Sequence, residues 1–142
     1  MGTGFDSPKV WSSRGRGFSM GLVAHAGQTV HLTGQVAWDS NEAIIGPGDV
    51  AAQTAACFDN IGALLEEVGG GLPDLVSVTT WFMDRTHLPL IQQVRARYLA
   101  FDNPPVSTSV MVAGLGDPGF MVELTAIAVV PDARFHAPGN NT

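Results

Sequence analysis

The most regular pattern of hydrophobic and polar positions spans residues 49–68. Apolar side chains recur there at the three- and four-residue spacing of one helical face. Asp49 suits the N-cap of such a helix, and a run of three glycines follows its last apolar position. Residues 87–102 repeat the spacing and are stopped by Asn103-Pro104-Pro105. The sequence therefore predicts two amphipathic helices.

Alternation with a period of two predicts the strands. It is clearest in residues 75–83, where Val78, Thr80 and Phe82 alternate with Ser77, Thr79 and Trp81. The other predicted strands are residues 18–26, 29–38, 106–115 and 120–130, the first two joined as a hairpin at Gly27-Gln28. This order of elements, without a repeat or a linker, favours one α+β domain whose mixed sheet carries both helices on one face.

The two ends of the chain lack such periodicity. Residues 1–17 are predicted to be a flexible N-terminal arm, residues 18–131 the single domain, and residues 132–142 a C-terminal tail. With both helices on one face, the other face of the sheet needs a cover, which a second copy of the chain can supply.

Composition supports an oligomer and excludes some partners. Of the 142 residues 45% are hydrophobic and only 14% charged, well below the usual share of about 25%. A neutral polar surface is the alternative interpretation. The net charge of −6, with 7 basic residues in no stripe, argues against nucleic acid and against anionic membrane surfaces as partners. The polar start is unlike a signal peptide, and no apolar run reaches about 20 residues, so a cytoplasmic location is expected.

Neither cysteine nor histidine provides a site by spacing. Cys57, the single cysteine, lies within the first predicted helix and is expected to be a buried, inert thiol. The 4 histidines show no metal-ligand spacing, and no phosphate-binding loop is present.

Short segments in a fixed order carry a resemblance to a known family. They are Thr33-Gly34-Gln35-Val36, Asp49 with Gln53 and Thr54, Asp59-Asn60-Ile61, Leu75 to Phe82, Val94-Arg95-Ala96-Arg97-Tyr98, Pro105-Val106-Ser107-Thr108-Ser109-Val110 and Val122-Glu123-Leu124-Thr125-Ala126-Ile127-Ala128. Together, from Phe18 to Val130, they resemble the Rid family, also called YjgF/YER057c/UK114.

The resemblance implies a chorismate-mutase-like α+β fold and a homotrimer. The sheets of such a trimer form an inner barrel with the helices outside, and three clefts lie between neighbouring subunits. The best-known members hydrolyse small reactive enamines and imines to keto acids and ammonia, without a metal or an organic cofactor. Some relatives have been described as ribonucleases, but the acidic charge of this chain argues against that activity.

One departure from the family pattern concerns substrate binding. The family has an arginine where Ser107 stands here, and a serine cannot grip a carboxylate with two parallel charged hydrogen bonds. Arg95 replaces the asparagine expected in the second helix. It either points into the same cleft or lies on the surface, paired with an acid. A trimer that binds a metabolite without turning it over is therefore the alternative to a deaminase.

The resemblance also nominates the remaining site residues. Glu123 matches the glutamate that positions water, so it is the predicted catalytic residue; a structural carboxylate at a subunit contact is the alternative. Phe18, Gly34 and the Val106-Ser107 backbone are predicted, with Arg95, to bind the substrate. Gly34 lets a ligand approach the backbone closely, or else marks a bend in the strand.

Overall fold

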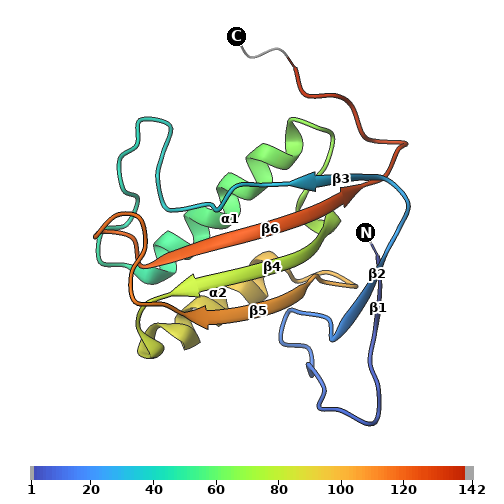
Figure 1. Ribbon diagram of the computed structural model, residues 1–142, viewed down its shortest axis with the longest axis horizontal. Coiled ribbons are helices and arrows are strands. Elements are labelled where there is room, and N and C mark those ends of the chain that lie inside the picture. The colour runs from blue at the N-terminus through green and yellow to red at the C-terminus, as the bar shows by residue number, and fades with distance from the viewer. Residues whose placement is uncertain (1, 140–142) are drawn as a thin grey trace.

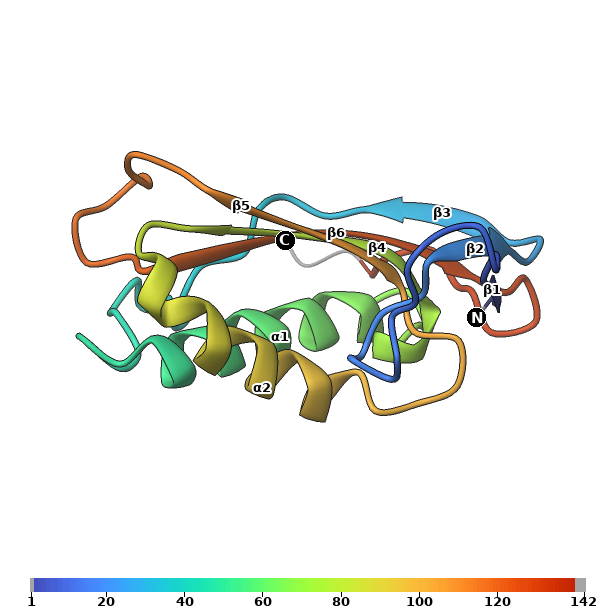
Figure 2. The same ribbon diagram turned by 90° about the horizontal axis from the view of Figure 1, so that it is seen from below.

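A four-stranded sheet with two helices on one face forms the centre of the protein (Figures 1 and 2). The computed structural model describes residues 2–139. The elements in chain order are β1 (Gly2–Phe5), β2 (Gly21–Ala24), β3 (Gln28–His31), α1 (Val50–Glu66), η1 (Leu72–Asp74), β4 (Leu75–Phe82), η2 (Arg85–His87), α2 (Leu88–Tyr98), β5 (Val106–Met111) and β6 (Val122–Val130).

The sheet is mixed, as the sequence predicts. Its strand order is β3-β6-β4-β5. The pair β4 and β5 is parallel, and helix α2 provides the crossover that a parallel pair requires. The other pairs are antiparallel, and Trp81 of β4 lies opposite Glu123 of β6. Strand β5 is left at one edge of the sheet, with Ser107 near its start.

The hydrophobic core lies between the helices and one face of the sheet. Phe58, Ile61 and Leu65 of α1 are fully buried there, against Val122 and Leu124 of β6. Burying each such side chain contributes about 1.5–3 kcal/mol. The intervening residues of β6, Glu123 among them, belong to the opposite face of the sheet. We call it the open face because no helix within residues 2–139 covers it (Figure 2).

The ends of the helices follow from local chemistry. Asp49 caps α1 because its Oδ1 accepts a hydrogen bond from the Ala52 N–H at 3.0 Å. Gly69, with a φ of 81°, reverses the chain after this helix. The second helix was predicted to reach residue 102 but ends at Tyr98. Asn103 adopts a left-handed φ of 56° immediately before Pro104, which disfavours helix at the preceding residue.

The N-terminal pairing was predicted wrongly. Residues 18–26 and 29–38 do not form a hairpin, because β2 pairs with β1 and β3 pairs with β6. Regular pairing in the second of these segments also ends early, at His31, and is followed only by isolated bridges at Gln35 and Trp38. The supposed flexible arm contributes strand β1, whose short glycine-rich sequence shows no alternation of its own.

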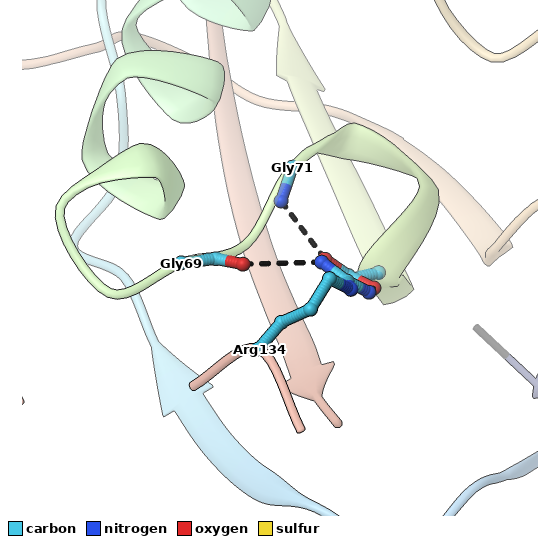
Figure 3. Close-up of polar contacts among 4 residues, drawn as sticks. Gly69, Gly71 and Arg134 are labelled. Carbon is cyan, nitrogen blue, oxygen red and sulfur yellow. Dashed lines mark hydrogen bonds and ion pairs between the residues drawn. The ribbon is translucent and has the colours of Figure 1, made fainter. Parts of the chain in front are cut away.

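The beginning of the C-terminal tail is anchored to the domain (Figure 3). Arg134 Nη1 and Nη2 donate to Asp74 Oδ2 and Oδ1 at 3.0 and 2.5 Å, and Nη1 also donates to the Gly69 carbonyl at 3.1 Å. The Gly71 N–H donates to Asp74 Oδ2 at 2.9 Å. Burial opposes ionisation of Asp74, but these bonds from Arg134 and Gly71 lower its pKa. Residues 140–142 of the predicted tail lie outside the described residues.

None of the helices within residues 2–139 has the length and apolar character needed to cross a membrane.

Candidate functional site

Three of the predicted binding residues meet at the edge of the sheet next to α2. Arg95 is only 3% exposed, although arginine is normally a surface residue. Its Nη1 donates to the Ser107 hydroxyl at 3.3 Å. Its guanidinium carbon lies 5.5 Å from the centre of the Phe18 ring, within cation–π distance. Phe18, Arg95 and Ser107, which we call the arginine cluster, therefore form one contact group.

The position of Arg95 follows from the spacing of α2. Ile91, Val94 and Arg95 form the buried stripe of this helix, whereas Arg97, two residues later, is exposed. Ser107 extends toward α2 from β5. The alternative that Arg95 lies on an exposed face is therefore wrong.

The electrostatics of Arg95 are unusual for a buried cation. Within residues 2–139 no carboxylate forms an ion pair with it, and its buried Nε has no hydrogen-bond partner. Burial lowers the pKa of the guanidinium, yet arginine remains protonated at neutral pH. A buried charge with free donors is costly unless an anion joins it. The arginine cluster is therefore suited to receive a carboxylate.

A second pair of predicted residues meets elsewhere on the sheet. The Glu123 carboxylate lies directly over Gly34, where a methyl group would overlap it. The backbone holds this approach, because Gln35 and Leu124 exchange N–H···O hydrogen bonds of 2.7 and 3.0 Å. Gly34 thus permits close contact with a side chain of its own chain.

The arginine cluster and Glu123 are separated within one chain. Ser107 lies opposite Val78 of β4, which in turn lies opposite Ala126 of β6, three residues from Glu123. With strands about 4.8 Å apart and a rise of about 3.4 Å per residue, the Cα atoms of Ser107 and Glu123 are about 14 Å apart. Ser107 faces α2, whereas Glu123 belongs to the open face. Val106, the neighbour of Ser107, also belongs to the open face by alternation.

No pattern in the sequence indicates the contacts that hold Phe18. Ser19 donates from its N–H to the Pro105 carbonyl at 3.1 Å and from its hydroxyl to the Pro104 carbonyl at 2.5 Å. The ring of Trp11 packs edge-on against Phe18 with the ring centres 6.0 Å apart. These partners come from distant parts of the chain, which no local pattern connects.

Metal-ligating side chains and the Cys57 thiol do not form a second candidate site within residues 2–139. Within residues 2–139 no three His, Cys, Asp or Glu side chains gather in a way that could hold a metal ion. Cys57 is fully buried, and burial together with the negative charge of Glu123 raises its pKa to about 12. Its thiol is therefore unsuited to nucleophilic chemistry, as the sequence predicts.

Comparison with known proteins identifies the family. The model of the Endoribonuclease L-PSP family matches residues 16–130. The chain is a member of the Rid (YjgF/UK114) family. The 3-aminoacrylate deaminase RutC of Acinetobacter baylyi is 30% identical over 105 residues, covering 74% of this chain and 82% of that protein. A RutC family protein of Pyrococcus abyssi is 31% identical over 102 residues, covering 72% and 79% of the two chains.

Solved structures of Rid proteins have the same fold. The Rid family protein YyfB of Yersinia pestis, whose function is unknown, superimposes with a TM-score of 0.85 at 25% identity, covering 91% of this chain and 98% of that one. RidA of an Antarctic Psychrobacter gives a TM-score of 0.67 at 28% identity, covering 75% of this chain and 85% of that one. The mixed α+β architecture expected from the sequence is thereby confirmed.

Proposed function

We propose that this Rid protein is a hydrolytic deaminase of small 2-imino acids or their enamine tautomers. The observation that carries the proposal is Arg95, a buried guanidinium that contacts Ser107 and has no carboxylate partner within residues 2–139. The 3-aminoacrylate deaminase among the relatives acts on a substrate of the same chemical class, an unsaturated amino acid.

We infer that the arginine has moved between elements during divergence from the family pattern. The family arginine belongs at the position of Ser107 on strand β5, whereas Arg95 comes from helix α2 and contacts that serine. A guanidinium is therefore kept near residue 107, although helix α2 carries it in place of strand β5. Its planar donors can hold a substrate carboxylate with two parallel hydrogen bonds.

The active site is proposed to be completed between the subunits of a homotrimer. Within one chain Glu123 is about 14 Å from Ser107 and on the other face of the sheet. Strand β5 is an edge strand, and the open face carries half-buried groups such as Trp81 and Thr125. Packing these open faces into an inner barrel would bring Glu123 of one subunit near the arginine cluster of its neighbour.

The proposed reaction needs a fixed anion and an oriented water. Arg95 holds the substrate carboxylate, and Glu123 accepts a hydrogen bond from the water that attacks the imine carbon. The new C–O bond forms as the C=N π electrons move to nitrogen, which takes up a proton. The resulting carbinolamine then loses ammonia as its hydroxyl becomes the carbonyl of the keto acid. No redox partner is required by this sequence of steps.

The test is the release of keto acid and ammonia from imines that an amino-acid oxidase generates in the assay. Arg95→Gln and Glu123→Gln should each lower the rate above the oxidase blank by about 10²-fold or more. Arg97→Gln, an exposed arginine on the same helix, is the matched control and should leave the rate within about twofold.

Two results would contradict the proposal. One is the absence of any acceleration over a broad panel of amino-acid imines, which would favour a metabolite-binding trimer. The other is equal loss in Arg95→Gln and Arg97→Gln, which would mean that the buried guanidinium has no particular part in the reaction.

A further inference from the structure

A buried amide on helix α1 holds the backbone at the start of strand β6. Gln53 is fully buried, although glutamine is normally a surface residue. Its Nε2 donates to the carbonyls of Gly119 and Gly46 at 3.0 and 3.3 Å, and its Oε1 accepts a hydrogen bond from the Met121 N–H at 2.9 Å. The side chain therefore ties the start of β6 to α1, two residues before Glu123.

A second amide on α1 holds the segment that follows Gly34. Asn60 lies two turns farther along the helix than the first amide and on the same side of it. Its Nδ2 donates to the Val36 carbonyl at 3.1 Å and to the Trp38 carbonyl at 3.2 Å. One helix, which packs beneath the sheet (Figure 2), thus anchors both of the backbone segments that meet at Glu123.

The place of the Glu123 carboxylate depends on both anchored segments. The carboxylate lies over Gly34, so a shift of either segment changes this contact. Cys57 lies between the two amides on α1, and the negative charge of Glu123 contributes to the raised pKa of its thiol. The carboxylate is therefore close to the part of α1 that carries the amides, and their hydrogen bonds limit where it can lie.

We infer that Gln53 and Asn60 are positioning residues, which fix the Glu123 carboxylate where it orients the attacking water. The inference rests on the proposed function, because that function gives Glu123 this task. A misplacement of about 1 Å can cost about 10²-fold in rate. The substrate carboxylate is held by Arg95 and not by Glu123, so the loss should fall on kcat while KM stays nearly constant.

Removing the amides tests the inference. Gln53→Met keeps a side chain of similar length but loses all three hydrogen bonds, and Asn60→Leu is a second variant in case the first folds poorly. Each should lower kcat with imine substrates by at least about tenfold and leave KM within about threefold. Thr54→Val is the matched control, because Thr54 is also fully buried on α1 but donates at 2.7 Å to the Val50 carbonyl of the same helix. It should leave kcat within about twofold.

Carboxyl ¹³C NMR of protein labelled on glutamate separates this inference from the proposed function. The Glu123 signal, assigned by its loss in Glu123→Gln, should shift in Gln53→Met and Asn60→Leu and stay in place in Thr54→Val. If the wild type turns over no imine but these shifts are found, the proposed deaminase fails and the positioning stands. A signal that stays in place in the folded amide variants, an equal shift in Thr54→Val, or amide variants that raise KM with kcat unchanged would overturn the inference.

Discussion

Replacing Arg95 with methionine should make the protein more stable and less active at once. If Arg95 stabilises the fold, this substitution should lower the free energy of unfolding. If Arg95 is instead a ligand-binding group that lacks a partner in the free protein, the substitution should raise it. Methionine can follow the aliphatic part of the arginine chain and is flexible enough to fill the space near Phe18 without a charge.

The magnitude follows from the contacts of the guanidinium. Taking a charge out of water costs several kcal/mol after relaxation. Against this cost stand one hydrogen bond of 3.3 Å to Ser107 and a cation–π contact with Phe18, together worth about 2–3 kcal/mol. The Nε is part of this cost that no protein group offsets, because it has no hydrogen-bond partner. Removing the charge should therefore raise the free energy of unfolding by about 1–3 kcal/mol.

Urea unfolding followed by circular dichroism, at one fixed protein concentration, measures this change. The concentration matters because assembly contributes to the stability of an oligomer. Arg97→Met is the matched control and should change the free energy of unfolding by less than about 0.5 kcal/mol, since Arg97 is exposed. In parallel, Arg95→Met should lose about 10²-fold or more in kcat/KM with imine substrates.

A lower stability of Arg95→Met would refute the reasoning. It would mean that an acid of a neighbouring subunit pairs with Arg95 in the assembled protein, so that the methionine leaves this acid unpaired. The guanidinium would then be a structural contact and would not be available to a substrate carboxylate.

Three further predictions concern Ser107, Asp74 and Cys57. Arg95→Asn should lose about 10²-fold in kcat/KM, and adding Ser107→Arg, which restores the family pattern, should recover at least about tenfold. A double variant no more active than the single one would contradict the proposal that the guanidinium has moved from strand β5 to helix α2. Asp74→Asn should be about 1–3 kcal/mol less stable than the wild type in urea unfolding at pH 7. The pKa of Asp74 in the folded protein lies below its ordinary value of 3.8, so the stability that its charge contributes is present above pH 3.8 and is lost as the pH falls through the folded pKa. The free energies of unfolding of the two proteins should therefore become equal at low pH. An unchanged difference there would contradict the role of the Arg134 ion pair. Cys57 is fully buried, and burial raises the pKa of its thiol, so a disulfide reagent should modify it in urea but not in the folded protein. Rapid modification of the folded protein would contradict the burial of this thiol.

The elements with strong local periodicity could be predicted from the sequence. Helix α1, its Asp49 cap and the Gly69 reversal agree with the structure, because a helix of this length fixes its own buried face and its own ends. Strands β4 and β6 agree for the same reason, since alternation is a local property. Strand β1 was missed, because its pairing with β2 leaves no mark on its own residues.

The candidate site was only partly determined by the sequence. Residue types and motif order were enough to indicate the family, to nominate Glu123 and to show that the family arginine is absent at Ser107. They left two directions open for Arg95, because a long side chain can point inward or outward from the same helix. Only the tertiary structure decided this, by placing Phe18 and Ser107 from remote segments against the guanidinium while leaving it without an acid within residues 2–139. Spacing along the chain constrains which face a residue lies on, whereas the partners on that face depend on how distant segments pack.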